Sequence, residues 1–354
     1  MIEDTVVTAS PDAVAGEEPR WPSLRAFVEQ SHMRSVIVGT SKDPNAKITI
    51  LLLPVDGDRP ALAVKVPTTD LAARAVEREG RMLVELRRRC RRSLLSSIPR
   101  VVDLLEFNGR TALVATAMPG VPMSTAYLRW RHTARRRTVA SDFAIASRWI
   151  AALQNETAWD PGLLEMGQDA AGILADRYAD DSKTAACIRQ LESICERLRT
   201  NRTPRTAVHG DLWFGNVLTV GGRITGVIDW ELGLSSGEPV RDLVRFPLMY
   251  ALYLDRHTFL GGSVAGHRGL RRSTWGAGIV HAIDGSGWFP DLVRGFIQAG
   301  LHRLGASPGS WRDAALAGVA EVAATTDDRE FGRHHLELFH RLTESPARNR
   351  RDRS

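Results

Sequence analysis

The sequence is organised around VHGDLWFGNVL at residues 208–218, which is followed after a short interval by VIDWE at residues 227–231. Alternating apolar residues lead to Asp211, and a short loop connects this residue to Asn216. A second apolar run ends at Asp229. We therefore expect a pair of short strands that brings these three polar side chains close together.

The three side chains would suit a divalent cation bound to a polyphosphate. Mg²⁺ prefers carboxylate and amide oxygens and usually shares them with substrate phosphates. Gly221 and Gly222 lie between the two apolar runs and favour a tight turn, which would join the strands as a hairpin. One carboxylate would then remain to orient a nucleophile. The alternative is an ordinary β-hairpin with two acidic turns.

HGDLWFGN followed by IDWE resembles the catalytic core of the aminoglycoside phosphotransferase/choline kinase superfamily, whose members are related to eukaryotic protein kinases. The resemblance implies an α+β, protein-kinase-like bilobal fold. Its small lobe would hold an antiparallel sheet plus one helix, and its large lobe would be mostly helical with a short catalytic hairpin. The resemblance also implies that Asp211 accepts the proton of the substrate hydroxyl, and that Asn216 and Asp229 bind the Mg²⁺ of ATP or GTP.

Four residues near these motifs have structural or open roles. His209 is predicted to support the loop through a bond between its ring and nearby backbone. Asp242 resembles the buried aspartate that braces the catalytic loop of the superfamily through backbone N–H groups, although an acid at a helix N-terminus is nearly as well supported. Trp213 and Phe214 stand where the superfamily often has His-Pro. They form either an apolar wall near the acceptor or packing beneath the loop.

Lys65 lies in a predicted strand at residues 61–66, where alternation places it on the opposite face from Val64 and Val66. The helix that follows carries an apolar stripe, and Glu79 lies in the middle of it. A lysine on a central strand needs a partner because burial of an unpaired charge is costly. We therefore predict a Lys65–Glu79 ion pair, which in kinases directs the lysine to the α- and β-phosphates. A salt bridge with no ligand is the alternative.

The rest of the nucleotide site is less clearly marked. Thr40 and Ser41 lie at the turn between the first two expected strands, and their hydroxyls with nearby N–H groups could hold phosphate oxygens. The turn lacks a glycine-rich phosphate motif, so a plain hairpin is an equal alternative. The backbone from Thr116 to Met118 resembles the hinge between kinase lobes and is predicted to contact the base edge. This contact does not distinguish ATP from GTP.

The 354 residues suggest two domains. We expect a mobile tail at 1–20, a nucleotide-binding lobe at 21–118, a catalytic and substrate-binding lobe at 119–345 and a second mobile tail at 346–354. The expected strands are at 35–41, 47–55, 61–66, 101–107 and 111–118. Besides the helix that carries Glu79, the expected helices include 23–31, two with apolar stripes at 139–153 and 188–198, and four more at 237–250, 291–304, 311–323 and 328–342.

The composition, 43% hydrophobic and 25% charged, is ordinary for a globular protein. The N-terminus is acidic and lacks the apolar core of a signal peptide, and no apolar run approaches the ~20 residues of a membrane span. Cys90, Cys187 and Cys195 lack the spacing of metal ligands, so we expect reduced thiols in a cytoplasmic protein with no membrane partner.

The formal charge of +6 includes arginine runs at residues 87–89, 91–92 and 135–137. These runs could bind nucleic acid. They follow helical apolar stripes, however, and lack interleaved aromatic residues. A solvated helix face is the better interpretation, so we expect no nucleic-acid partner, and a monomer or homodimer.

The acceptor is the least constrained part of the prediction. A polycationic aminoglycoside needs an acidic pocket, whereas the chain from Pro239 onward has 12 acidic residues against 16 arginines. The count weakly favours a nucleoside antibiotic, a sugar or another hydroxylated metabolite, and aminoglycosides stay possible, so the protein could be an antibiotic-resistance enzyme. A peptide acceptor is disfavoured because HRD, DFG and APE segments are absent. A catalytically silent kinase-like binding module is the alternative of another class.

Overall fold

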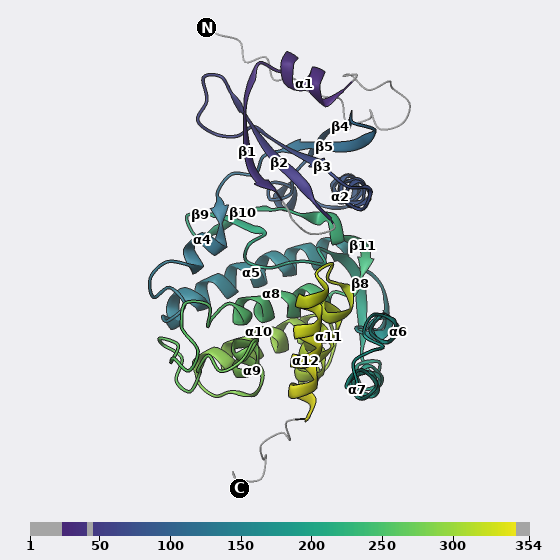
Figure 1. The fold of residues 1–354 in the computed structure, drawn as a ribbon, viewed down its shortest axis with the longest axis vertical. Coiled ribbons are helices and arrows are strands. Elements are labelled where there is room, and N and C mark those ends of the chain that lie inside the picture. Colours follow the sequence, from purple (N-terminus) through teal and green to yellow (C-terminus); the bar gives the residue numbers. More distant parts are fainter. Residues whose placement is uncertain (1–22, 41–44, 345–354) are drawn as a thin grey trace.

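The computed structural model describes residues 23–40 and 45–344, and a five-stranded antiparallel sheet forms its N-terminal part (Figure 1). In spatial order the strands are β1 (Met33–Thr40), β2 (Lys47–Pro54), β3 (Leu62–Pro67), β5 (Arg110–Thr116) and β4 (Val101–Phe107). The predicted strands are therefore present, with ends that differ by one or two residues.

The two faces of this sheet are covered by different helices, α1 (Leu24–Gln30) and α2 (Asp70–Arg89). Val64 and Val66 on β3 share a core cluster with Leu24 and Phe27 of α1. The opposite face contributes its apolar residues to the core that contains α2. The alternation predicted for β3 is therefore correct, and it directs Lys65 toward α2.

Two tight turns have the backbone that their sequences predict. Asn108 and Gly109 have φ values of 50° and 74°, and Gly221 and Gly222 have values of 56° and 74°. Positive φ at both central residues is typical of the two-residue hairpin turns that match strand twist. The second turn joins β9 (Val217–Val220) to β10 (Arg223–Val227) and so forms the expected catalytic hairpin.

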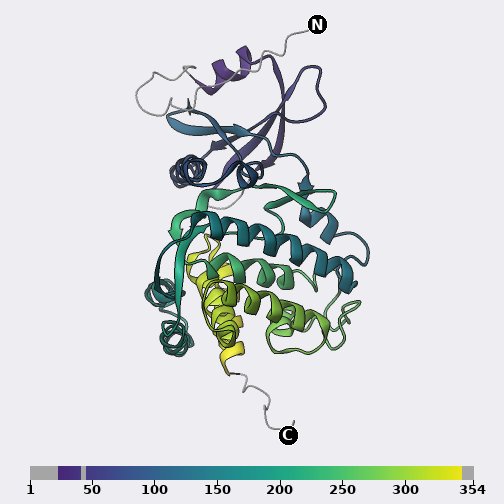
Figure 2. The ribbon, with the colours of Figure 1, turned by 180° about the vertical axis from the view of Figure 1, so that it is seen from behind.

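The remainder of the chain is mostly helical, as Figures 1 and 2 show from opposite sides. A short strand, β6 (Val121–Pro122), pairs with β9, and a second small sheet has the order β11 (Leu234–Gly237), β8 (Arg202–Val208), β7 (Trp159–Leu163). The helices are α3 (Arg92–Leu95), α4 (Met123–Tyr127), α5 (Arg136–Thr157), α6 (Gln168–Arg177), α7 (Thr184–Leu198), α8 (Val240–Leu252), α9 (Ala277–Asp284), α10 (Trp288–Arg303), α11 (Trp311–Thr325) and α12 (Arg329–Glu344), with short 3₁₀ turns η1 (Trp230–Leu232) and η2 (Pro308–Ser310).

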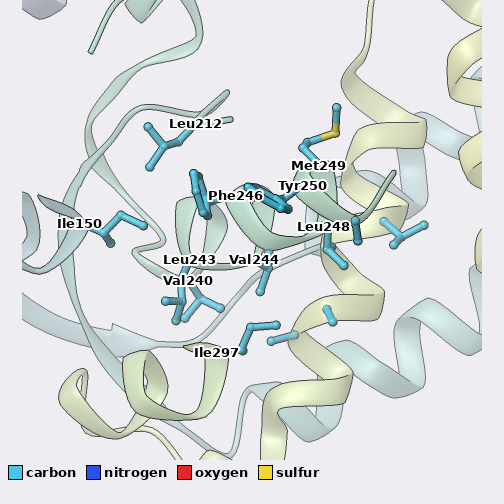
Figure 3. Close-up of a cluster of buried hydrophobic side chains, with 14 of the residues drawn as sticks. Ile150, Leu212, Val240, Leu243, Val244, Phe246, Leu248, Met249, Tyr250 and Ile297 are labelled. Carbon is cyan, nitrogen blue, oxygen red and sulfur yellow. The ribbon is translucent and has the colours of Figure 1, made fainter. Parts of the chain in front are cut away.

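The helix α8 lies at the centre of the C-terminal core (Figure 3). Its apolar side chains are almost completely buried, and they gather with Ile150 of α5 and Ile297 of α10. Leu212, the residue after Asp211, belongs to the same cluster and is 1% exposed. The loop that carries Asp211 is therefore anchored to α8 by hydrophobic packing.

Three helices differ from the sequence prediction for identifiable reasons. Helix α8 begins at Val240, three residues later than expected, because Gly237 still belongs to β11. Helix α10 begins at Trp288, three residues earlier than expected. Pro290 is then in the first turn, where a missing N–H costs little. Helix α9 was not predicted, because it is short and flanked by glycines. It packs so closely on α8 that a Cβ on Gly278 would lie 2.0 Å from the carbonyl oxygen of Ala251.

The predicted tails, together with Ser41, lie outside the described residues. Cys90, Cys187 and Cys195 are buried and form no disulfide, and burial raises the pKa of each thiol to about 11. Most side chains of the arginine runs are exposed. Within the described ranges, no helix has the length and apolar character needed to cross a membrane.

Candidate active site

Lys65 lies between two carboxylates where the N-terminal sheet meets the catalytic hairpin. Its Nζ is 2.6 Å from both carboxylate oxygens of Glu79 and 2.5 Å from Oδ1 of Asp229. Burial opposes the charge on Lys65, but the two carboxylates more than compensate, so the pKa of Lys65 is raised. Burial likewise opposes the charge on Asp229, yet Lys65 lowers its pKa. The predicted Lys65–Glu79 ion pair is therefore present, and it extends to Asp229.

Glu79 also positions the turn that presents Asp229. It is 2% exposed, and its Oε1 accepts a 3.3 Å hydrogen bond from the N–H of Trp230. Asp229 itself has φ 65° and ψ 60°, the left-handed conformation that few non-glycine residues adopt. Such strain persists where the surroundings hold it, and it is common at functional sites. Here the buried indole of Trp230 and the Glu79 carboxylate supply that support.

A second ion pair joins the N-terminal sheet to the same turn. Lys47 on β2 contacts the carboxylate of Glu231, and Asn45 Nδ2 donates to the same group over 3.4 Å. Burial raises the pKa of Glu231, and the charge of Lys47 opposes this rise. Sequence analysis did not identify this pair, because its members are 184 positions apart and Lys47 has no motif around it.

Asp211 and Asn216 face each other across the catalytic loop. Asn216 Nδ2 donates to the backbone oxygen of Asp211 over 3.0 Å and to its Oδ2 over 3.3 Å. Since the amide nitrogen faces Asp211, the amide oxygen, the type of atom that Mg²⁺ prefers as a ligand, is directed elsewhere. The side chain of Asp211 is 28% exposed and so can reach a substrate.

The main chain of Ile228 joins this loop to the turn that carries Asp229. Its N–H donates to the backbone oxygen of Asn216 over 3.0 Å. Its carbonyl oxygen lies 2.8 Å from Nε2 of His209, whose ring is completely buried. The predicted bond between the His209 ring and backbone is thus confirmed. Lys65, Asp229, Asp211 and Asn216 are therefore brought into one region.

Helix α8 holds three consecutive residues of the catalytic loop through two side chains on one face. Asp242, 2% exposed, accepts hydrogen bonds from the N–H groups of His209 (2.6 Å) and Gly210 (2.9 Å). One turn later, Arg245 donates from Nε (3.0 Å) and Nη2 (2.6 Å) to Oδ1 of Asp211. Of the two readings of Asp242, the bracing aspartate is the one observed. Arg245 was missed.

Gly210 makes this arrangement possible. Its φ is 82°, and a Cβ at this position would lie 2.3 Å from the carbonyl oxygen of Leu232. Both the conformation and the space exclude a larger side chain. The glycine of the HGD motif is therefore required by the close approach of η1 to the loop.

Residues 53–266 match the family model described as "Phosphotransferase enzyme family" (APH). The chain belongs to this family. No curated protein matches the chain.

Solved structures of phosphotransferases share the fold. Aminoglycoside phosphotransferase APH(4)-Ia aligns with a TM-score of 0.56 at 15% identity, covering 90% of this chain and 97% of that one. ADP-bound APH(2'')-Ib has a TM-score of 0.53 at 16% identity, with 90% and 96% covered. The streptomycin–ATP–APH(2")-IIa ternary complex has a TM-score of 0.52 at 15% identity, with 90% and 94% covered. At these identities the likeness confirms the predicted fold class.

The aromatic pair in the loop of this phosphotransferase separates into two roles. Phe214 is 1% exposed and stacks on Tyr127 with ring centroids 4.4 Å apart, so it packs beneath the loop. Trp213 is only partly buried and stacks on Tyr253 with centroids 5.7 Å apart and an interplanar angle of 22°. Phe214 therefore fits the packing alternative, while an apolar wall near the acceptor stays a prediction for Trp213.

The remaining predicted nucleotide contacts are less well supported. Thr40 ends β1, and Ser41 lies outside the described residues. The N–H of Thr116 donates to the carbonyl of Arg100, and the N–H of Ala117 donates to the carbonyl of Ala61. Both N–H groups are thus already hydrogen-bonded to neighbouring backbone, so the edge of a nucleotide base would have to pair with Met118 or with carbonyl oxygens. The N–H of Thr116 is therefore not free to donate to a base, and the predicted hinge contact is corrected at this residue.

Proposed function

We propose that this protein transfers the γ-phosphoryl group of ATP or GTP to a hydroxyl group of a small molecule. The observation that carries the proposal is the convergence of Lys65, Asp229, Asp211 and Asn216, which come from elements far apart in the sequence. A silent binding module would be expected to have lost at least one of the four. Solved relatives with the same fold contain ADP, or ATP with streptomycin.

The donor set fits a magnesium–nucleotide complex. Asn216 and Asp229 would hold Mg²⁺ through an amide oxygen and a carboxylate, and the metal would neutralise charge on the phosphates. The ammonium of Lys65 would contact the α- and β-phosphate oxygens. The described residues contain no group of three or more His, Cys, Asp and Glu side chains able to hold a metal ion. Two protein ligands suit Mg²⁺ that is shared with a nucleotide.

Asp211 is the proton acceptor in this proposal. The acceptor oxygen forms a bond to the γ-phosphorus as the bond from that phosphorus to the β–γ bridging oxygen breaks. The hydroxyl proton moves to the Asp211 carboxylate, and the nucleoside diphosphate leaves. A general base of this kind contributes ~10²–10⁴-fold in rate. Positioning and charge neutralisation supply most of the remaining catalysis.

The acceptor proposed from sequence is an antibiotic, such as an aminoglycoside or nucleoside antibiotic, with resistance as the biological role. A sugar or another primary metabolite is the alternative. We also propose the division into lobes at residue 118 and a cytoplasmic location, which buried, unpaired thiols would suit.

Two substitutions separate the proposed roles. Asp211→Asn should leave calorimetric binding of Mg²⁺–ATP or Mg²⁺–GTP intact and lower turnover by at least ~10²-fold. Asp229→Ala should abolish the part of nucleotide affinity that depends on Mg²⁺. Asp291→Asn, an exposed change on α10, serves as the control. Near-normal turnover by Asp211→Asn would refute the assigned role of Asp211.

A further inference from the structure

The proton acceptor of the proposed reaction already has a cationic partner. Two nitrogens of the Arg245 guanidinium contact Oδ1 of Asp211, and the side chain of Arg245 is 18% exposed. A charged acceptor approaching Asp211 would therefore meet a compensated carboxylate. For a polycation, this removes an attraction that an unpaired aspartate would provide.

An aromatic stack lies beside the same loop. The indole of Trp213 covers the backbone so closely that a Cβ on Gly215 would lie 2.3 Å from its ring. Tyr253, which follows α8, stacks on the Trp213 indole, and the guanidinium carbon of Arg256 lies 3.8 Å from the Tyr253 ring centroid. Trp213 and Tyr253 are both partly exposed. The stack therefore offers planar apolar surface that ends in a positive charge.

The segment that continues from this stack is basic and apolar. Residues 253–276 contain four arginines and a single acidic residue, Asp255, which is 7% exposed. Phe259 and Leu260 in this segment are 81% and 72% exposed.

A second loop adds apolar side chains on the same side of the molecule. The loop after α4 touches residues 253–276 where His267 Nε2 lies 2.8 Å from the carbonyl oxygen of Thr133. Both segments lie on one side in Figures 1 and 2. Leu128 and Trp130 of this loop are 56% and 89% exposed. Helix α4, which precedes this loop, adjoins the catalytic loop, since the N–H of Ser124 donates to the carbonyl oxygen of Phe214. Scattered exposed apolar residues are ordinary, but a group of them on one side of the molecule is typical of a ligand surface.

From this placement we infer that the acceptor binds against the Trp213–Tyr253–Arg256 stack and that it carries a planar or apolar portion beside its hydroxyl and no net positive charge. The inference rests on the proposed phosphoryl transfer and names its substrate class. It favours neutral or anionic acceptors over polycationic aminoglycosides.

Three probes of nearly equal size test the inference: 4-(hydroxymethyl)benzamide, 4-(hydroxymethyl)benzoate and 4-(aminomethyl)benzyl alcohol. Each is offered with Mg²⁺–ATP or Mg²⁺–GTP, and nucleoside diphosphate release and the phosphorylated product are measured. Streptomycin represents the polycations. We expect kcat/KM for the amide and the benzoate to exceed that for the amine by at least about 10-fold, with no stimulation by streptomycin.

Substitutions in the Trp213–Tyr253–Arg256 stack test whether the preference among the three probes arises there. Tyr253→Ala should raise KM for the benzamide about 10-fold and change kcat little, because the ring contributes binding and not chemistry. Arg256→Glu, an exposed change, should lower the benzoate-to-amine ratio of kcat/KM about 10-fold. Trp159→Ala, an exposed aromatic residue on β7, should leave both values unchanged.

The outcomes separate this inference from the proposed function. If the wild-type protein fails to bind Mg²⁺–ATP and Mg²⁺–GTP by calorimetry, the proposed function fails. If it binds nucleotide but uses the amine or streptomycin at least as well, the inference is overturned and the phosphotransferase proposal stands. If nucleotide binds and neither the benzamide nor the benzoate stimulates nucleotide consumption, the inference is likewise overturned.

Discussion

At the nucleotide end of the site, a lysine lies between the carboxylates of Glu79 and Asp229. At the proposed acceptor end, a carboxylate, Asp211, is contacted by Arg245 and lies next to an aromatic stack. Lys65 and Glu79 are buried, and their pairing follows from strand and helix periodicity. Asp211 lies in a motif, whereas its partner Arg245 belongs to no motif. The difference follows from the ligands. Every phosphotransferase must bind the same triphosphate, but acceptors differ in shape and charge.

The largest effect should follow from breaking the buried ion pair at the nucleotide end. Lys65→Met leaves Glu79 buried without its cation, and we expect the free energy of unfolding to fall by about 3–5 kcal/mol. Adding Glu79→Met should restore most of this stability without restoring turnover. Urea denaturation and nucleoside diphosphate release measure the two quantities.

The exposed Arg25–Glu29 pair on α1 is the control for this comparison. Arg25→Met should leave the free energy of unfolding nearly unchanged, because exposed pairs contribute little. If the Lys65→Met/Glu79→Met protein proved as unstable as Lys65→Met, burial of an unpaired charge would not be the cause.

At the acceptor end, Arg245→Gln should lower kcat by about 10²-fold with unchanged nucleotide affinity. The reason is that Asp211 would lose the two-point contact with the guanidinium that fixes its orientation, and a small misplacement of a catalytic group can lower the rate by this factor. Arg245→Lys should be intermediate, since it keeps the charge without the two-point contact. Arg312→Gln, which removes an arginine–carboxylate pair between α11 and α9, is the control. If Arg245→Gln lowered nucleotide affinity by as large a factor as kcat, the substitution would instead have caused a general structural defect.

Acid should destabilise the C-terminal part through a buried histidine before it affects the ion pairs of the nucleotide end. Burial lowers the pKa of His335 on α12 to about 3, and the charge of Arg245 acts in the same direction. A lowered histidine pKa gives stability that is present above about pH 6.5 and is lost as the pH falls toward the folded-state value. We expect this ring to account for a loss of about 2 kcal/mol between pH 7 and pH 5. The pKa of Asp229 is also lowered, so its contribution is lost only at still lower pH.

Urea denaturation at pH 7 and pH 5 checks this expectation. The difference between the two pH values should shrink in His335→Gln and stay unchanged in His302→Gln, an exposed histidine on α10. An identical pH difference in the wild type and His335→Gln would contradict the assignment.

The contrast between the nucleotide end and the acceptor end also explains how much of the site could be predicted from the sequence. The strand period of two and the helix period of 3.6 both depend on local sequence, and together they were enough to pair Lys65 with Glu79. The two hairpin turns were predictable because their glycines and Asn108 suit positive φ. The catalytic residues were identified by their motifs, while their functions stay a prediction.

What could not be predicted depends on contacts between distant elements. Arg245 follows Asp242 by three positions, so a shared helix face could have been read from the sequence. Its contact with Asp211, however, requires knowing how α8 crosses the loop. The partner of Lys47 is on η1, and the pairing of β7 and β11 with β8 depends on the packing of the whole C-terminal part. No local period encodes such distances.

The two carboxylates around Lys65 have a consequence for how a nucleotide would enter. An incoming phosphate would exchange places with Asp229 at the ammonium group, while Glu79 stays in contact with it. The exchange would release Asp229 toward the metal, so anion and cation would have to arrive as a unit. Nucleotide without a divalent ion should then bind poorly, because it would displace a carboxylate and leave that carboxylate with no new counterion.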